Sequence, residues 1–382
     1  MRIVVNTLSV SRGRTGGGET YLVNLTKWLA RVSPGDEFVL IESGRNRACF
    51  EGLPENVEHR FIPRPFSSRG MRVLFERLFL ERTTRRLAPD VLFMPGNAGL
   101  PHPPCAEVVA VQSLLPMLAP EEVGFARRVY FRRALPGDLR RATLVLAVSQ
   151  DIGQVLQRRM GVPAEKIRVV HEGVSVTFAP VRDEEVLRRE LATAGVHRPY
   201  LLLVGGLKRY KNADKAILAL ARLNTMIDVP RQLVVIGSDR GGVRPELERL
   251  AAEAGVGNAV RFAGTVEHAR LAAFYSGADA LVFPSSIESF GLPVLEAMAC
   301  GLAVVGSNCA SVPEIIGDAG LTVDPSDIGA LAEALRRVLK DEPLRRELLR
   351  KGFERVRHFS WERSARGVLA VLREAAEMGR TP

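Results

Sequence analysis

Short apolar runs alternate with longer amphipathic segments along the whole chain, and the alternation starts afresh near residue 200. This pattern predicts βα units, because consecutive parallel strands must be joined by a crossover that is usually a helix. The expected strands lie at 3–6, 37–42, 91–94, 108–111, 144–148 and 167–170, and then at 200–204, 232–236, 260–262, 280–283, 303–306 and 321–323. We therefore predict an α/β fold with two doubly wound parallel-sheet domains.

A turn-rich stretch over residues 171–180 separates the two halves of the pattern. A chain of 382 residues is too long for one typical core, so two domains are the natural division. We predict an N-terminal domain over residues 1–176 and a C-terminal domain over residues 177–360, followed by a final amphipathic helix over 361–382.

The segment 284–301 places two carboxylates, Glu288 and Glu296, on either side of a glycine turn. It follows an apolar strand, and helix-favouring residues begin at Leu292, with Pro293 tolerated in the first turn. The free N–H groups of a helix N-terminus attract an anion such as a diphosphate. Ionised glutamates only accept hydrogen bonds, which sugar hydroxyls donate. Because a nucleotide sugar is a diphosphate with a sugar at each end, we predict that this segment binds one.

The segment reads Pro-Ser-x-x-Glu-x-Phe-Gly-Leu-Pro-x-Leu-Glu-Ala-Met-Ala-x-Gly, with Glu288 and Glu296 as its glutamates. It resembles the signature of the retaining GT-B glycosyltransferases of family 4, also called glycosyl transferases group 1. The resemblance implies that Glu296 binds the ribose hydroxyls and that Glu288 engages hydroxyls of the transferred sugar. It also implies that sugar and phosphate meet the backbone N–H groups of Phe290, Gly291 and Leu292. An ordinary strand–loop–helix with solvated glutamates is the alternative.

The resemblance has consequences for the architecture as well. It implies a GT-B fold of two Rossmann-like domains that face each other across a cleft. The first domain would receive the acceptor, and the final helix over 361–382 would pack back on it. The second domain would bind the nucleotide sugar, with the base near Val266.

A second glycine-containing segment, residues 205–212, follows the first strand of the second half. Gly205 and Gly206 permit a close backbone approach, and a lysine supplies a compact charge for a phosphate oxygen. The segment resembles the family pattern Gly-Arg-Leu-x-x-x-Lys-Asn, which assigns the diphosphate lysine to Lys211. Gly206 stands where the family has arginine, so Lys208 or Arg209 would supply the missing charge, and we favour Arg209. A basic surface loop is the alternative.

In the first half, Gly16, Gly17 and Gly18 precede an expected helix and form a candidate phosphate or sugar cradle. They resemble the N-terminal glycine loop of the family, although a flexible loop is the alternative. The spacing is not Gly-x-Gly-x-x-Gly, so a nicotinamide site is not expected. Gln112 follows a later strand, where the family often has histidine. Glutamine can hydrogen-bond a sugar hydroxyl but cannot shuttle a proton.

The formal charge of +10 is unevenly distributed. Residues 1–180 hold 25 Arg and Lys against 17 Asp and Glu, a balance of +8, whereas the rest holds 28 against 26, a balance of +2. Such an excess indicates an anionic partner, such as nucleic acid, anionic lipid or a phosphorylated small molecule, and a simple arginine-rich composition is the alternative. Nucleic acid is not expected, because the chain has no paired strand aromatics and no zinc-finger spacing.

The expected helix at 72–87 and the segment 127–133 of the expected helix at 126–141 combine apolar and basic residues. We interpret one apolar stripe of the first as core, and it comprises Met71, Leu74, Phe75 and Leu78. Phe79 and Leu80 could instead enter an anionic bilayer beside arginines, namely Arg72, Arg82, Arg85 and Arg86. The sequence therefore leaves an anionic membrane surface open as a partner of the N-terminal domain.

Cofactor-binding and targeting signals are lacking in the sequence. The cysteines have no Cys-x-x-Cys spacing, so neither a zinc site nor a disulfide framework is expected; they are Cys49, Cys105, Cys300 and Cys309. No Asp-x-Asp or metal-spaced His/Asp/Glu cluster occurs, so we expect no metal and no cofactor beyond the donor substrate. No signal peptide or apolar stretch of the ~18 residues of a membrane span is visible. We predict a cytoplasmic protein, at most peripheral on the inner face of the plasma membrane.

Together these patterns predict a retaining, metal-independent hexosyltransferase. The expected donor is a GDP- or UDP-hexose, with mannose favoured from the likeness to mannosyltransferases over residues 205–212 and 114–116. The expected acceptor is a hydroxyl of a glycan or lipid-linked glycan in cell-surface polysaccharide or glycoconjugate biosynthesis. A GT-B nucleotide-sugar epimerase and a non-catalytic nucleotide-sugar-binding protein are the alternatives.

Overall fold

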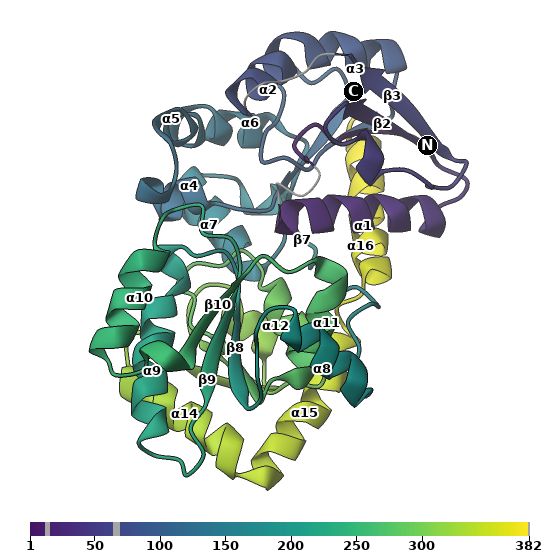
Figure 1. Cartoon of the computed structure of the whole chain (residues 1–382). Helices are drawn as coiled ribbons and strands as arrows, with labels where there is room; N and C mark the ends of the chain where they lie inside the picture. Colours follow the sequence, from purple (N-terminus) through teal and green to yellow (C-terminus); the bar gives the residue numbers. More distant parts are fainter. Residues whose placement is uncertain (12–15, 64–68, 381–382) are drawn as a thin grey trace. The chain divides into compact units, whose positions relative to one another are not determined.

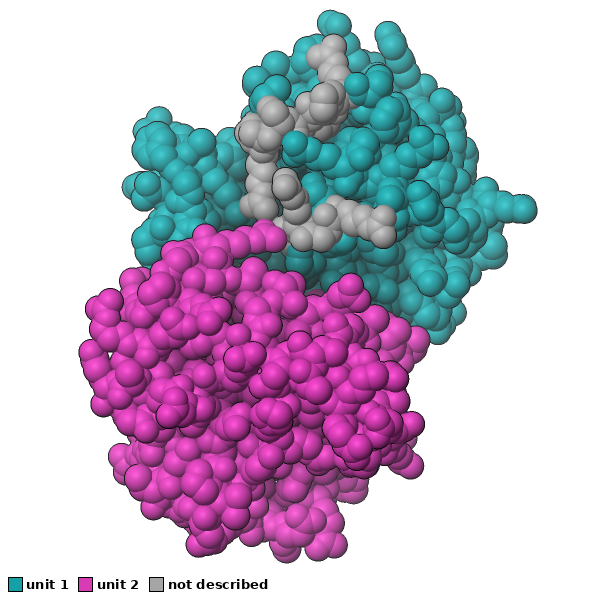
Figure 2. Space-filling view, viewed as in Figure 1, with its two compact units in different colours: residues 1–173, 360–382 teal, residues 174–359 magenta. Residues whose placement is uncertain are grey.

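The structure is a computed structural model that describes residues 1–11, 16–63 and 69–380. It divides into two compact units, one formed by Met1–Gly173 together with Ser360–Pro382 and the other by Val174–Phe359 (Figure 2). The junction falls slightly before the boundary at residue 176 that we drew from the sequence. Each unit contains one parallel sheet, as expected for doubly wound domains.

The first unit is built on a seven-stranded sheet in the order β3-β2-β1-β4-β5-β6-β7 (Figure 1). Its strands are β1 Arg2–Asn6, β2 Glu37–Ser43, β3 Val57–Ile62, β4 Val91–Met94, β5 Ala106–Val111, β6 Leu144–Ala147 and β7 Ile167–Val169. Six were expected, and β3 was missed. Charged residues interrupt its apolar pattern, which suits an edge strand that is buried on fewer sides.

The helices of the first unit include α1 Gly17–Val32, α7 Gln150–Met160 and α16 Trp361–Met378. Ser149 caps α7 as expected, since its side chain accepts a hydrogen bond from the N–H of Ile152. Helix α16 contacts α1, β4 and β5, and the rings of Tyr21 and Trp361 meet edge-on at 6.1 Å. The remaining helices are η1 Arg47–Cys49, α2 Arg69–Phe75, η2 Glu76–Leu80, α3 Glu81–Leu87, α4 Leu115–Leu118, η3 Pro120–Glu122, α5 Phe125–Arg133, α6 Leu135–Arg141 and η4 Ala164–Lys166.

The helix expected over 72–87 is divided into α2, the π-helical turn η2 and α3. Our prediction that it presents a core stripe is wrong, because three of the four residues are more than half exposed: Met71 at 51%, Leu74 at 58% and Leu78 at 58%. Leu80, for which we left insertion into a bilayer open, is fully buried. Apolar residues occur on both sides of this helix, so their spacing alone does not decide which side faces the core.

A buried carboxylate accounts for the orientation of α2 and η2. Glu76 is only 2% exposed and accepts hydrogen bonds from Asn6 Nδ2 at 2.9 Å and from Arg72 Nη1 at 2.7 Å. A buried charge must keep such partners, so Glu76 faces the interior and the opposite side of the helix faces solvent. Arg72 is therefore committed to Glu76 and does not belong to the basic surface that we predicted.

The second unit is built on a six-stranded sheet in the order β10-β9-β8-β11-β12-β13. Its strands are β8 Tyr200–Val204, β9 Gln232–Ile236, β10 Val260–Gly264, β11 Ala280–Phe283, β12 Val304–Ser307 and β13 Leu321–Val323. Its helices are α8 Glu184–Ala192, η5 Arg209–Lys211, α9 Ala213–Asn224, α10 Arg244–Glu253, η6 Gly257–Ala259, η7 His268–Arg270, α11 Leu271–Gly277, α12 Leu292–Ala299, α13 Val312–Ile316, α14 Ile328–Lys340 and α15 Glu342–Val356. Helices α9 and α14 pack together over one face of the sheet (Figure 1).

The strand order of this sheet reverses between β8 and β11. Ligands of doubly wound sheets bind beyond the carboxyl ends of the strands at such a switch point. The loop after β8 is residues 205–208, and the loop after β11 is residues 284–291. Both glycine-containing motifs of the second half are therefore placed where the fold favours ligand binding.

Candidate active site

Hydrogen bonds tie the segment that follows β8, through η5 to the start of α9, to the loop after β11. Asn212 donates from Nδ2 to the carbonyl oxygen of Pro284 at 2.8 Å, and the N–H of Ser286 donates to the carbonyl oxygen of Tyr210 at 2.9 Å. Asn212 adopts a left-handed backbone, with φ of 53°, at the start of α9. Asparagine tolerates that conformation better than most residues, which fits its place at this turn.

Lys211 of η5 and Glu288 of the loop after β11 form an ion pair. Their side chains are only 15% and 12% exposed. The amine of Lys211 also lies 5.6 Å from the ring centroid of Phe283 and 5.5 Å from that of Tyr210. The structure thus brings together the two side chains that we assigned to phosphate and to transferred sugar, in surroundings where charge interactions are strong.

Two glycines permit the close approach of backbone beside this pair. A Cβ added to Gly237, which follows β9, would lie 1.9 Å from the carbonyl oxygen of Gly205. Both glycines have positive φ values, 152° for Gly205 and 156° for Gly237, that other residues rarely adopt. A Cβ on Gly205 would lie 3.7 Å from side-chain carbons of Lys211, so this lysine extends over the end of β8. A Cβ on Gly206 would meet Ser238 at ordinary contact distances, 3.5 Å from its carbonyl oxygen and 3.9 Å from its hydroxyl oxygen.

The structure places Arg209 and Lys208 differently from Lys211. Arg209 donates from Nη1 and Nη2, its two terminal guanidinium nitrogens, to the carboxylate of Glu246 on α10, at 3.0 and 2.7 Å. The side chains of Arg209 and Glu246 are 68% and 56% exposed. This bond lowers the pKa of Glu246. Lys208 extends toward Gly241, where an added Cβ would lie 3.5 Å from its amine. The family has an arginine where this chain has Gly206. To take the role of that arginine, Arg209 would have to release Glu246 and bind a phosphate instead.

Glu296 lies on α12 and is 6% exposed. The hydroxyl of Tyr275 donates to its Oε2 atom at 2.7 Å, and Nε2 of His268 lies 3.5 Å from its Oε1 atom. Burial and the adjacent carboxylate raise the pKa of Tyr275 well above its usual range, so the hydroxyl stays protonated and donates. Burial and the same carboxylate raise the pKa of Cys300 to about 12, which leaves its thiol neutral.

Aromatic rings surround this carboxylate. Phe178 contacts His268 and Tyr275 edge-on, with centroid distances of 4.9 and 5.9 Å. Sequence reasoning missed Tyr275 and His268, and the only signal was that His268 closely follows the candidate base contact Val266. Val266 lies in the loop between β10 and η7, as expected for a residue beyond a strand end.

The remaining residues of the 284–301 segment form the turn into α12. Gly291 has a positive φ of 117° and precedes Leu292, the first residue of the helix. Ser311 donates from its hydroxyl to the carbonyl oxygens of Phe290 at 2.8 Å and Glu288 at 3.2 Å. These bonds fix the backbone of the turn at the N-terminus of α12.

In the first unit, the predicted residues gather at the corresponding switch point, between β1 and β4. Gly16 caps the N-terminus of α1 with φ of 56°, and Gly17 and Gly18 form its first turn. A Cβ added to Gly18 would lie 3.1 Å from Oε1 of Gln112. Gln112 is itself fixed, because its Nε2 donates to the carbonyl oxygen of Pro95 at 2.7 Å. The structure therefore brings Gln112 and the glycines together, while residues 12–15 of that loop lie outside the described residues.

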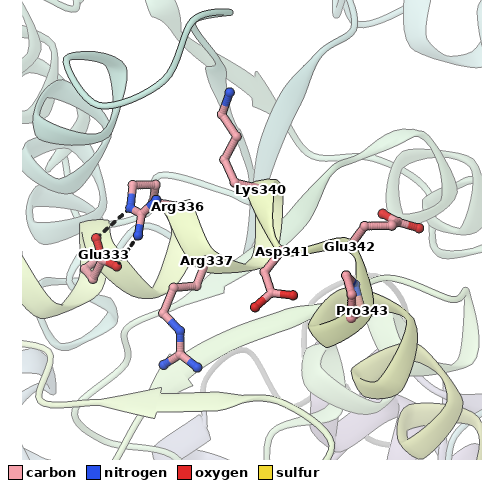
Figure 3. Close-up of a pocket in the computed structure, with 7 residues that line it drawn as sticks. All are labelled: Glu333, Arg336, Arg337, Lys340, Asp341, Glu342 and Pro343. Atoms are coloured by element: carbon pink, nitrogen blue, oxygen red, sulfur yellow. Dashed lines mark hydrogen bonds and ion pairs between the residues drawn. The ribbon is translucent and has the colours of Figure 1, made fainter.

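A hollow at the α14–α15 corner is unrelated to these residues (Figure 3). Its lining is charged, and Arg336 and Glu333 pair with each other at 2.7 Å within it. No predicted site residue is among the residues that line it, namely Glu333, Arg336, Arg337, Lys340, Asp341, Glu342 and Pro343.

Comparison with known proteins defines the class to which this fold and site belong. Residues 188–355 match the family described as glycosyl transferases group 1, and residues 15–178 match glycosyltransferase family 4. The chain belongs to this glycosyltransferase family and has its GT-B fold of two Rossmann-like domains.

Individual relatives match over nearly the whole chain. The chain is 31% identical over 379 residues to O-antigen chain mannosyltransferase B of Escherichia coli, covering 95% of this chain and 97% of that protein. Sucrose-phosphate synthase of Thermosynechococcus elongatus has a similar fold, with a TM-score of 0.75, 22% identity and coverage of 99% and 100%. Anabaena HepE in complex with UDP and glucose gives a TM-score of 0.74, with 18% identity and coverage of 98% and 100%.

Proposed function

We propose that this glycosyltransferase moves a hexose, with mannose favoured, from a nucleotide diphosphate sugar to a hydroxyl of a glycan or lipid-linked glycan. The Lys211–Glu288 pair at the switch point of the second unit is the observation that carries the proposal. The mannosyltransferase relative supports mannose and a role in cell-surface polysaccharide synthesis. The complex of HepE with UDP supports a nucleotide diphosphate, and we favour GDP over UDP as the carrier of mannose.

Glu296 would hold the ribose through one carboxylate oxygen. Its Oε2 atom is already engaged by Tyr275, whereas Oε1 lies 3.5 Å from His268. A ribose hydroxyl would donate to Oε1, and the Tyr275 bond would keep the carboxylate from rotating. The base would then lie toward Val266.

Lys211 would neutralise the diphosphate while Glu288 accepts hydrogen bonds from the transferred sugar. When the donor binds, its diphosphate would replace Glu288 as the anionic partner of Lys211, so the positive charge of Lys211 stays compensated. The stabilising effect would grow as negative charge develops on the departing diphosphate, which is the condition for accelerating the reaction. The N–H groups of Phe290, Gly291 and Leu292 at the start of α12 would add to it.

We propose transfer with retention of configuration at the anomeric carbon. The bond from that carbon to the diphosphate oxygen breaks, and a bond to the acceptor oxygen forms. Gln112 can hydrogen-bond a hydroxyl but cannot take its proton. The proton of the acceptor hydroxyl would therefore pass to the departing diphosphate, with Gln112 and the glycines at 16–18 positioning sugar and acceptor.

Incubation with a panel of nucleotide sugars, with GDP-mannose first, tests this function. Release of nucleoside diphosphate together with a new α-linked product, identified by the one-bond coupling between its anomeric carbon and proton, is expected. An epimerase would return the sugar still attached to the nucleotide, and a non-catalytic binding protein would return the donor unchanged. Either of those results would replace the proposal.

We further expect activity to be unaffected by exhaustive treatment with EDTA. Our proposal assigns the diphosphate charge to Lys211 and to the N-terminus of α12, so no cation is required. The initial rate should be the same before and after chelation, measured with a protein dialysed free of the chelator. A loss of rate that Mg²⁺ or Mn²⁺ restores would contradict metal independence.

No helix of the described part of the chain is both long and apolar enough to cross a membrane. Since a lipid-linked acceptor lies in a bilayer, we propose that the protein acts as a peripheral protein at the inner face of the plasma membrane.

A further inference from the structure

The solvent-facing side of α2 and η2 is apolar, which is the reverse of an ordinary surface helix. Four large apolar side chains lie there: Met71 at 51% exposed, Leu74 at 58%, Leu78 at 58% and Phe79 at 43%. The buried side carries Glu76 and, in the continuation of the helix, Leu80 and Thr84. Contiguous exposed apolar residues of this kind mark an interaction surface rather than ordinary solvent exposure.

Helix α5 repeats this arrangement. Phe125 is 74% exposed and Val129 is 37% exposed, one turn apart, whereas Phe131 on the other side of the helix is 4% exposed. The helix has the sequence FARRVYFRR, so it contains four arginines and no acidic residue. Its exposed side therefore combines apolar residues with arginines, and the helix itself contains no acidic residue beside them.

A buried carboxylate joins the two helices. Asp138 of α6 is fully buried, and its Oδ2 atom accepts hydrogen bonds from Arg77 of η2 at 2.8 Å and from Tyr130 of α5 at 3.0 Å. Arg141 completes the joint by donating to Oδ1 at 2.6 Å. The helices that carry the two apolar faces are thus linked through one buried carboxylate, and Figure 1 shows α2, α5 and α6 in the same region of the first unit.

The exposed arginines around the two faces give the region its charge. They are Arg82 and Arg86 on α3 and Arg128, Arg132 and Arg133 on α5. Arg85 contributes less, because it pairs with Glu81 at 2.9 Å. We call the exposed apolar residues of α2, η2 and α5, together with these five arginines, the α2–α5 surface.

We propose that the α2–α5 surface docks on an anionic lipid bilayer. Arginines would bind lipid phosphates while the apolar side chains enter the boundary between headgroups and acyl chains. Phe, Met and Arg are also enriched in protein interfaces. We favour a bilayer because basic residues that flank exposed apolar residues on surface helices are the pattern of segments that lie at the surface of anionic membranes. The inference rests on the proposed function in one respect, namely that the acceptor is lipid-linked.

Sedimentation with vesicles tests the proposal on the whole protein. Vesicles of phosphatidylcholine with phosphatidylglycerol should bind it at low salt, and vesicles of phosphatidylcholine alone should bind far less. Since salt screens exposed charges within a Debye length of ~10 Å at 0.1 M, binding should fall steeply by ~0.5 M. Replacing Arg128, Arg132 and Arg133 by serine should reduce the partition coefficient by roughly a hundredfold, because each basic residue near the surface contributes about fivefold.

A second variant separates the apolar contribution from the charge. The double change Leu74→Ser and Leu78→Ser should weaken binding by about tenfold while leaving its salt dependence intact. Serine at three exposed arginines of the second unit, Arg188, Arg346 and Arg350, is the matched control and should leave binding unchanged. Thermal melting checks that every variant is folded.

The outcomes distinguish this inference from the proposed function. Each variant should retain normal turnover on a short soluble acceptor. The inference is overturned if the protein ignores anionic vesicles at low salt, or if both α2–α5 variants bind like the unchanged protein. Vesicle binding without transfer to any acceptor would reject the proposed function and leave the docking surface standing.

Discussion

Replacing Lys211 by alanine should lower turnover by about 10²–10³ even when the donor is saturating. The expected loss is that of a group aimed at charge that develops in the transition state. The change also leaves Glu288 without its ion-pair partner at 12% exposure, so thermal stability should fall to some extent. Single-turnover rates at saturating donor and melting curves measure the two effects separately.

Two further variants show whether the loss is catalytic. Lys215→Ala on α9 removes a lysine paired with Asp214 and should leave turnover unchanged. The double variant Lys211→Ala with Glu288→Gln removes both charges, so stability should recover while turnover remains low. Recovery of both would mean that the pair is structural and that Lys211 does not meet the diphosphate. Arg209→Ala, compared with Lys208→Ala, shows which of them replaces the family arginine.

Replacing Glu296 by alanine should weaken nucleoside diphosphate binding by between about tenfold and a hundredfold. A hydrogen bond to a charged group contributes roughly 1.5–3 kcal/mol, and Glu296 is the proposed acceptor for ribose. Calorimetry with GDP and UDP measures the dissociation constants. A dideoxyribose analogue should bind the variant and the unchanged protein alike, because the hydroxyls that distinguish them are missing.

Tyr275→Phe probes the same carboxylate from the other side. It keeps the ring but removes the donor to Oε2 of Glu296, so affinity should fall by less than in Glu296→Ala. Glu333→Ala at the α14–α15 corner is the matched carboxylate control. An unchanged dissociation constant in a folded Glu296→Ala variant would remove Glu296 from the site.

The regular part of the fold was predictable because its signals are local. Strands buried on both faces, such as β8 and β11, read as continuous apolar runs, and their loops carry the glycine and glutamate motifs. Strand β3 escaped because Glu58, His59 and Arg60 interrupt its pattern. The orientation of α2 and η2 escaped because it depends on Asn6, seventy residues from Glu76 in the sequence.

The motifs predict individual residues of the candidate site, but they do not predict how these residues are arranged. The motifs identified Lys211, Glu288 and Glu296, yet nothing in them indicates that Lys211 and Glu288 pair directly. Tyr275 reaches Glu296 from another helix, and Gly237 matters only because the carbonyl of Gly205 lies against it. Contacts between segments that are distant in sequence produce no recognisable residue spacing within either segment.

The place of α16 in the first unit bears on how the protein is made. Arg373 on this helix binds Asp36 at 3.0 Å, and Glu374 binds Arg168 at 3.0 Å. Asp36 and Arg168 are synthesised before the second unit, whereas their partners on α16 are synthesised after it. The first unit is therefore discontinuous in sequence, and the surface that α16 covers stays exposed until this helix has been synthesised. Synthesis of the first unit begins before that of the second, yet the first unit cannot become a finished domain until the second has been made.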